Sequence, residues 1–452
     1  SNAKVDALYA RQSTTLQTAR ARYSLRNKRP PPSMYDKWFD FAREHSCLID
    51  DYDQITRDFE PFYQLAHHDP AYFKRMVVKS SAQVRQKFSW TDDQGTLYNG
   101  DWERTFGRFA SLIPDMTAVL NGRDERRVLF NYRQPDGQLE ALNASDATPF
   151  EHSPRPTASF FKDDMKCFVP NQPTGFTNLV NDASARVYTN HDFPGSNTDT
   201  LGSYVFTTDL YPVMSMCRIN PCFGDILVPS EVRVPVQVMH PAFGSHPISQ
   251  YANNISWVDK EPKLYWRGLT SGGRVFGDNY RAFPRFRLIE IGKKHRKTMN
   301  VVLSGFHGDL CEQCNEGRIK MEYEIASKGS PREDVYKYKF LMDVDGNSFS
   351  GRYLGLLRSG SLVFKSTAFA EFFNDWLIPY EHYIPVLPDL SDLVDKVNWA
   401  VENDDEAHRI QQAGQAFAER VLTNDQNDCY FSRVLLEWAR LEAMTDAAGA
   451  TR

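Results

Sequence analysis

The spacing of hydrophobic and polar positions becomes regular after residue 259. Short apolar runs bounded by turn residues are typical of buried strands. The second half of the chain predicts such strands at residues 264–267, 299–303, 339–344 and 361–364, with helices expected at 281–295 and 351–357. Strands that alternate with helices form a parallel sheet covered by helices. The expected fold class is therefore α/β.

The first half of the chain has a less regular pattern. Helices are expected at residues 35–45 and through most of 48–110, and strands at 115–121 and 225–229. Residues 134–175 are rich in proline and aspartate, which predicts a long loop.

These changes in pattern divide the chain into four segments. Residues 1–30 are polar and basic and lead into three prolines, which predicts a stem or linker. An N-terminal lobe of residues 31–258 and a C-terminal lobe of residues 259–425 are expected to follow. The chain then closes with a helical segment within residues 426–452.

The turn after the predicted strand 339–344 is a candidate anion site. Asp345, Gly346 and Asn347 break the strand, and Ser350 is expected to cap a helix that begins at Gly351. The N-terminus of a helix favours an anion, so the positive charge of Arg352 in the first turn is locally unfavourable. A phosphate group of a ligand bound there would remove this conflict. The alternative is that Arg352 points to solvent or pairs with Glu371.

A second loop of small residues follows the predicted strand 264–267. It contains Gly268 and Ser271 between Arg267 and Arg274. An arginine can bind two phosphate oxygens at once, and small residues let backbone N–H groups approach. Neither loop matches a Walker or dinucleotide fingerprint. The alternative for Arg267 is an ion pair at the edge of the core.

Two short patterns raise the question of a metal. Asp343 and Asp345 form an Asp-x-Asp pattern, whose two carboxylates can hold a divalent cation under a diphosphate. Because arginines already supply positive charge, we expect no required cofactor and no metal ligand, with Mn²⁺ or Mg²⁺ as the alternative. Cys311 and Cys314 have the spacing of half a zinc site, but nothing completes it, so disulfides are the favoured interpretation.

Composition excludes some classes of protein. Of 452 residues, 41% are hydrophobic and 25% charged, which suits a soluble globular enzyme. The net charge of −5 gives no reason to expect nucleic acid as a partner. No run of 18 apolar residues is present. The first three residues, Ser-Asn-Ala, are typical of tag removal, so we expect the natural protein to carry an N-terminal membrane anchor.

The segment from Tyr336 to Val386 resembles glycosyltransferase family 90, which includes Rumi-type protein O-glucosyltransferases and fungal capsule-associated xylosyltransferases. The matching residues are Lys337-Tyr338-Lys339, Asp345-Gly346, Ser350 with Arg352, Gly360-Ser361-Leu362-Val363, Glu371-Phe372-Phe373 and His382-Tyr383-Ile384-Pro385-Val386. The run Trp266-Arg267-Gly268 also resembles the family's signature.

This resemblance implies a GT-B fold, with two Rossmann-like lobes and a cleft between an acceptor-side N-terminal lobe and a C-terminal lobe that binds the nucleotide sugar. The residues expected around the diphosphate are Arg267, Gly268, Ser271, Arg274, Ser350 and Arg352. Glu371 is expected to accept hydrogen bonds from the nucleotide ribose, with the capping of a helix near Thr367 as its alternative. His382 is expected to wall the donor site.

The resemblance also implies the catalytic base and one disulfide. Asp124 ends a run, residues 119–124, that resembles the strand delivering the family's catalytic aspartate, and Glu125 is open as a second carboxylate for that role. The alternative for Asp124 is a structural carboxylate neutralised by neighbouring arginines. Cys429 resembles the family's late cysteine, whose implied partner is Cys47, so the last helix is expected to pack on the N-terminal lobe.

The expected function is that of an inverting, metal-independent glycosyltransferase of the Golgi or endoplasmic reticulum lumen, with a type II membrane topology in its natural form. The run Asp124-Glu-Arg-Arg127 resembles fungal members, which favours UDP-xylose as donor and a mannose-containing glycan as acceptor. One alternative is transfer of glucose or xylose to a serine of a folded protein domain. The other is a carbohydrate-binding relative that has lost activity.

Overall fold

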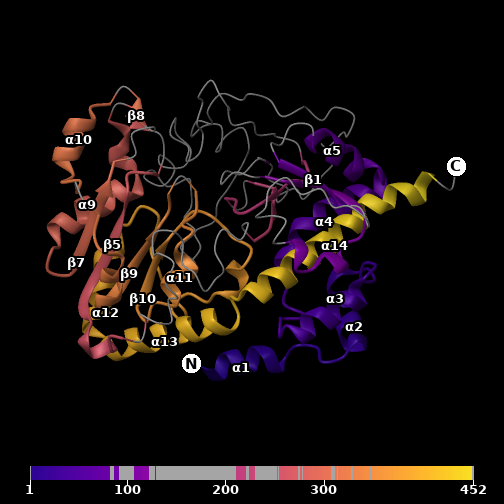
Figure 1. The fold of residues 1–452 in the computed structure, drawn as a ribbon, viewed down its shortest axis with the longest axis horizontal. Helices are drawn as coiled ribbons and strands as arrows, with labels where there is room; N and C mark the ends of the chain where they lie inside the picture. The colour runs from indigo at the N-terminus through magenta and orange to yellow at the C-terminus, as the bar shows by residue number, and fades with distance from the viewer. Residues whose placement is uncertain are drawn as a thin grey trace.

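The computed structural model describes residues 2–81, 86–90, 106–121, 128, 210–219, 223–229, 252, 254–272, 275–276, 278–306, 311–312, 314–326, 329–346 and 348–449 (Figure 1). The elements from residue 261 onward surround one sheet, and the early helices surround another. The last helix runs from the first group across the second (Figure 1).

The C-terminal sheet is parallel throughout. Its five strands lie in the spatial order β7 (Met299–Gly305), β5 (Glu261–Leu269), β9 (Tyr338–Val344), β10 (Leu362–Ser366) and β11 (Ile384–Pro385). Counted along the chain this order is 2-1-3-4-5, so the direction of winding reverses between β5 and β9. In open parallel sheets, ligands bind beyond the carboxyl ends of the strands at such a reversal.

Both faces of this sheet are buried, as parallel sheets require. Side chains alternate between the faces along each strand, so Leu264 and Phe340 join one core while Tyr265 and Leu341 join the other. Helices α9 (Pro284–Lys294), α10 (Glu316–Glu322) and α12 (Leu393–Glu402) contribute to the first core. Helix α11 (Tyr353–Leu357) contributes to the second, and α13 (Asp404–Arg420) contributes to both. The predicted α/β layer is confirmed.

The N-terminal sheet is short and mixed. Strand β1 (Gln86–Trp90) is antiparallel to β2 (Met116–Leu120), and β2, β3 (Met214–Ser215) and β4 (Ile226–Leu227) are parallel. Its helices are α3 (Tyr35–Glu44), α4 (Asp53–His68) and α5 (Tyr72–Ser81). The strand β1 lies in a segment that the sequence predicts to be helical. Two short strands, β6 (Val275–Phe276) and β8 (Cys311–Glu312), form a separate parallel pair.

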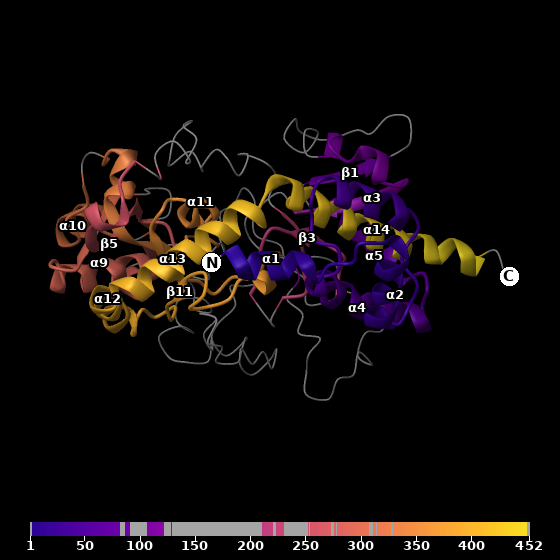
Figure 2. The same ribbon diagram turned by 90° about the horizontal axis from the view of Figure 1, so that it is seen from below.

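Residues 2–27 are not the linker that their polar composition predicts. They form α1 (Asn2–Ala10) and α2 (Leu16–Asn27), and α1 lies beside α13 (Figure 2). Val5, Ala19 and Tyr23 are buried, and the Tyr23 hydroxyl donates to Glu437 Oε1 at 2.7 Å. A few well-placed apolar contacts therefore dock a segment whose average composition is polar.

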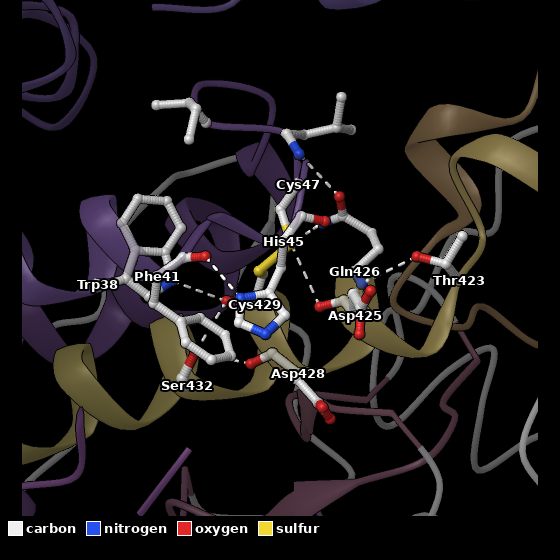
Figure 3. Close-up of a disulfide and its surroundings, with 12 residues drawn as sticks. Trp38, Phe41, His45, Cys47, Thr423, Asp425, Gln426, Asp428, Cys429 and Ser432 are labelled. Carbon is white, nitrogen blue, oxygen red and sulfur yellow. Dashed lines mark hydrogen bonds between the residues drawn. A yellow bond between two sulfur atoms is a disulfide. The ribbon is translucent and has the colours of Figure 1, made fainter. Parts of the chain in front are cut away.

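Helix α14 (Asn424–Gly449) packs against α3, α4, α5 and β2. A disulfide between Cys47 and Cys429 fixes its first turns to the end of α3, as the resemblance implies (Figure 3). Around it, Trp38 Nε1 donates to the Cys429 carbonyl at 2.9 Å, and the Leu48 N–H donates to Gln426 Oε1 at 2.8 Å. Among the described residues, no helix is long and apolar enough to span a membrane.

Candidate functional site

Two loops meet at the carboxyl edge of the C-terminal sheet, where the winding reverses. One follows β5 and contains Ser271 and Gly272, and the other follows β9 and contains Gly346. Gly272 has a φ of +135°, and a Cβ on it would lie 3.9 Å from the Gly346 carbonyl oxygen. The loops therefore approach closely where a parallel sheet is expected to bind a ligand.

The indole of Trp266 is buried beneath these loops. A Cβ on Gly268 would lie 2.5 Å from the indole Cζ2, so only glycine at this position lets the ring lie along the strand. The centroid of the ring is 5.6 Å from the Arg285 Cζ and 5.7 Å from the Arg352 Cζ. The pair Trp266 and Gly268 thus builds an aromatic surface that two guanidinium groups contact.

Arg352 points into this region. Its Nη1 donates to the Arg267 carbonyl at 2.9 Å, and its Nε contacts Ser350 Oγ at 3.4 Å. Its Nη2 is buried and has no hydrogen-bond partner within the described part of the chain. Burial lowers the pKa of this guanidinium. Arg352 as a whole is half-buried, but its Nη2 does not reach solvent, and no ion pair with Glu371 is seen among the described residues.

The prediction that Ser350 caps the following helix is wrong. Helix α11 begins at Tyr353, its N-cap residue is Arg352, and no side chain caps it. The Ser350 carbonyl accepts from the Tyr353 N–H at 3.3 Å instead. Ser350 is buried, and its hydroxyl faces the Arg352 side chain.

The Arg267 guanidinium is not brought together with that of Arg352. Its Nε donates to Ser330 Oγ at 3.0 Å, its Nη1 to the Asn300 carbonyl at 2.8 Å and its Nη2 to Asn300 Oδ1 at 2.8 Å. These partners are neutral, so the predicted ion pair is not seen either. Arg267 fixes β5 to β7, and only its backbone carbonyl reaches Arg352. Arg274 lies outside the described residues.

A residue that the sequence analysis missed, Arg285, occupies the site instead. It lies in the first turn of α9, after Pro284. Its Nε donates to the Asp345 carbonyl at 2.9 Å and its Nη1 to the Leu269 carbonyl at 2.9 Å, and Nη1 also contacts Ser271 Oγ. Burial, and the neighbouring Arg352, lower the pKa of this guanidinium to about 9. Arg285 therefore joins the two loops and adds a second cation.

The two aspartates of the Asp-x-Asp pattern face groups of the protein. Asp343 is fully buried, and its Oδ2 accepts from Lys365 Nζ at 3.1 Å. Asp345 Oδ2 accepts from the Ala368 N–H at 2.8 Å. In the described ranges, no three or more His, Cys, Asp or Glu side chains are grouped so as to hold a metal ion. A lysine therefore already neutralises Asp343.

Glu371 lies in the loop after β10, close to the same lysine. It is 7% exposed, and its Oε2 is 3.8 Å from Lys365 Nζ. The predicted helix near Thr367 is absent from this described loop, which holds only a 3₁₀ turn at Asn374–Trp376, so the capping alternative is not seen. Burial raises the pKa of Glu371 to about 8, with Asp343 and Asp345 adding to the rise and Lys365 opposing it.

We predict that Glu371→Gln raises stability more at pH 9 than at pH 5. The folded protein keeps a proton on Glu371 that the unfolded chain loses above its usual pKa of 4.5. The stability from this proton is complete below pH 4.5 and is lost as the pH rises through about 8. Glutamine never ionises, so its advantage should grow by about 4 kcal/mol between the two pH values, at about 1.4 kcal/mol for each pH unit from 5 to 8. Urea unfolding of both proteins measures it, and an equal difference at pH 5 and pH 9 would contradict the assignment.

His382 lies away from this edge of the sheet. It precedes β11, and its ring stacks on Phe417 of α13 with centroids 4.3 Å apart. Its Nδ1 accepts from the Ile378 N–H at 3.0 Å, and burial lowers the pKa of the imidazole to about 4. These contacts describe a packing residue, not the predicted wall of a donor site.

Asp124 lies outside the described residues, but the residues that flank its segment belong to one buried network. Asn121 Nδ2 donates to Ser215 Oγ at 3.1 Å, and that hydroxyl donates to Asp225 Oδ1 at 2.6 Å. The Val128 N–H donates to Asp225 Oδ2 at 2.9 Å. Asp225 therefore connects the carboxyl end of β2 to Val128.

The same region contacts the C-terminal half of the chain. Arg218 and Ala370 exchange two backbone hydrogen bonds of 3.1 and 2.7 Å. The Arg218 side chain forms a buried ion pair with Asp58 at 2.7 Å. Since Ala370 precedes Glu371, this contact joins the edge of the N-terminal sheet to the loop beside Lys365.

The cysteine pair that could have been half of a zinc site does not provide two thiolates. Cys314 is in a disulfide and cannot act as a thiolate ligand. Cys217 is buried and lies outside any disulfide.

The chain is similar to known proteins over part of its length. The chain is 32% identical to protein O-glucosyltransferase 3 of Rattus norvegicus over 41% of its own length and 33% of that protein. It is 36% identical to protein O-glucosyltransferase 1 of Homo sapiens over 25% of its own length and 30% of that protein. The matched part thus spans about a third of the length of these curated relatives.

One solved structure is also similar, the C-terminal domain of a glycosyl transferase group 1 family protein (LpcC) from Francisella tularensis. It is 15% identical, with a TM-score of 0.25, and the match covers 41% of this chain and 97% of that one.

The family model of glycosyl transferase family 90 matches residues 207–448, which is more than half of the chain. The matched range includes both loops at the carboxyl edge, Arg285, Arg352 and the buried pair Asp343 and Lys365. The chain therefore belongs to glycosyltransferase family 90.

Proposed function

We propose that this protein transfers a sugar from a UDP-sugar to a hydroxyl group, with inversion at the anomeric carbon. The observation that carries the proposal is the buried Nη2 of Arg352, which has no partner among the described residues and lies at the carboxyl edge where the winding reverses. A buried cationic donor without a partner is costly. The diphosphate of a nucleotide sugar would supply the missing acceptor.

The proposed reaction is a single in-line displacement. The acceptor oxygen forms a bond to the anomeric carbon, the bond from that carbon to the diphosphate oxygen breaks, and UDP leaves with the electron pair. Arg352 would stabilise the charge that develops on the leaving diphosphate. Asp124 would take the proton of the acceptor hydroxyl as general base. No step of the proposed reaction requires a metal. The ion pair between Asp343 and Lys365 supports a metal-independent reaction, because the lysine already neutralises that carboxylate.

The GT-B arrangement is part of the proposal. Asp124 would face the donor site from the N-terminal lobe. Two observations support this: its segment follows β2, and the Arg218 and Ala370 contact joins that sheet to the loop of Glu371. Glu371 would meet the nucleotide ribose only if the Lys365 contact opened, because the carboxylate is buried.

The relatives favour a protein acceptor. Both named relatives are protein O-glucosyltransferases, which supports glucose as the donor sugar and a hydroxyl of a folded protein domain as acceptor. A second candidate is UDP-xylose with a mannose-containing glycan, which the Asp124-Glu-Arg-Arg127 run favours. The Cys47–Cys429 disulfide supports an oxidising lumen of the secretory pathway as the compartment.

A panel of UDP-sugars tests the function. We expect UDP release from UDP-glucose or UDP-xylose, faster with acceptor protein or mannoside present and retained in EDTA. Thermal stabilisation by UDP without release from any donor would favour an inactive carbohydrate-binding relative. If UDP does not stabilise the protein and no donor releases UDP, the proposal is contradicted.

A further inference from the structure

We propose that Asn254 is a site of N-linked glycosylation. Asn254, Ile255 and Ser256 form the sequence that accepts such a glycan, which is asparagine, any residue except proline, and serine or threonine. A second sequence of this kind begins at Asn143 and lies outside the described residues. The proposal rests on the lumenal compartment, which the Cys47–Cys429 disulfide supports, and not on the sugar-transfer activity.

The acceptor sequence lies on the surface in an irregular segment. Asn254 and Ser256 are exposed, and they precede a 3₁₀ turn, η5 (Trp257–Asp259), that leads into β5. The Asp259 N–H donates to the Ser256 carbonyl at 3.0 Å, so the turn begins just after the acceptor sequence. A glycan is bulky and hydrated, and an exposed segment outside helices and strands can carry it in the folded protein.

The residues after the acceptor sequence hold it at the amino edge of the C-terminal sheet. Trp257 packs against Phe340 of β9 with ring centroids 6.2 Å apart, and its Nε1 donates to Asp404 Oδ2 at 3.1 Å. Lys260 Nζ donates at 2.6 Å to the carbonyl of Tyr336, which precedes β9. The loops of the proposed donor site follow the opposite ends of the strands. Strand β5 has 9 residues, which at about 3.3 Å per residue separates the two edges by about 25 Å. A glycan on Asn254 would therefore leave the donor site open.

The strand order also keeps the asparagine accessible while the chain is being made. Strand β5 pairs with β7 and β9, which both follow it in the sequence, so it cannot enter the sheet before they exist. Roughly 90 residues separate Ser256 from the end of β9, and their synthesis takes about 4–18 s at the usual rate. A transferase that acts on the unfolded chain thus has time to modify Asn254 before the sheet forms.

The modification needs one co-reactant, an oligosaccharide carried on a polyisoprenyl diphosphate lipid. A bond forms between Asn254 Nδ2 and the anomeric carbon of the first N-acetylglucosamine. The bond from that carbon to the diphosphate oxygen breaks, the lipid diphosphate leaves with the electron pair, and the amide nitrogen loses a proton.

Mass spectrometry of the protein secreted by a eukaryotic cell, behind a cleavable signal sequence, tests the proposal. Peptide N-glycosidase releases the glycan and converts the asparagine to aspartate, so the mass of the peptide that contains residue 254 reports the modification. We expect most wild-type chains to carry a glycan at Asn254, and Asn254→Gln to lose it.

Two substitutions at Ser256 form the matched pair. Ser256→Ala removes the hydroxyl that the acceptor sequence requires and should abolish the glycan, whereas Ser256→Thr keeps a hydroxyl and should retain it. Protein that stays in the cell is digested in the same way, so a variant that is not secreted still gives a result. An unmodified Asn254 in wild type, or a glycan that persists in Ser256→Ala, would overturn the proposal.

The rate of UDP release separates this proposal from the proposed function. Asn254→Gln should release UDP as fast as wild type, because the glycan lies at the opposite edge of the sheet. A slower rate in this variant would contradict that placement. Wild type that carries the glycan but releases UDP from no donor would instead contradict the proposed function.

Discussion

Asp124→Asn is expected to lower kcat by about 10²- to 10⁴-fold, the usual contribution of a general base. Asparagine has nearly the same shape but cannot take the proton of the acceptor hydroxyl. Because the proposed diphosphate site lies in the C-terminal lobe, UDP affinity should stay within about twofold of wild type. Initial rates of UDP release and UDP titrations on the same preparations measure both quantities.

Glu125→Gln is the matched control for this substitution, since it removes the adjacent carboxylate of the same run. It should retain most of the activity. Loss of activity in Glu125→Gln with full activity in Asp124→Asn would move the base to Glu125. Full activity in both would contradict a base in this segment.

Replacing both Cys47 and Cys429 with serine is expected to lower the free energy of unfolding by about 3–5 kcal/mol. The disulfide joins residues 382 positions apart, so it greatly restricts the unfolded chain. It also anchors α14, whose buried residues Val434, Leu435 and Trp438 pack into the N-terminal core. Urea unfolding of variant and wild type measures the difference.

The control for thiol removal is Cys217→Ala, because Cys217 is buried but not in a disulfide. Reducing agent should lower the stability of this control as it does that of wild type. Reducing agent should lower the free energy of unfolding of the double variant less, because that variant already lacks the Cys47–Cys429 bridge. Equal stability of the double variant and wild type would contradict a structural role for the bridge.

The sheet of the C-terminal half could be predicted because its strands β9 and β10 are buried on both faces. Apolar runs such as 339–344 and 361–364 then stand out between turn residues, and the structure has β9 and β10 there. The strands of the N-terminal half were harder to predict, because they are short and pair with strands that are distant in sequence. Residues 2–27 were misjudged because three buried apolar side chains count for more in packing than the polar average of the segment.

The candidate site was predicted in part. Arg352 could be found because it follows a strand and a loop of small residues. Arg285 could not, because it reaches the site from a helix through tertiary contacts that leave no fixed spacing in the sequence. Its only local signal is its place after Pro284, at the start of the helix that follows the glycine-rich loop. Arg267 shows the converse error, since a motif position does not reveal that neighbouring strands already use its donors.

The most direct test of the account is the structure of the protein bound to UDP. The account predicts the diphosphate beyond the carboxyl ends of β5 and β9, with a phosphate oxygen about 2.7–3.1 Å from the Arg352 Nη2. UDP bound elsewhere, with that Nη2 still buried and without a partner, would contradict it.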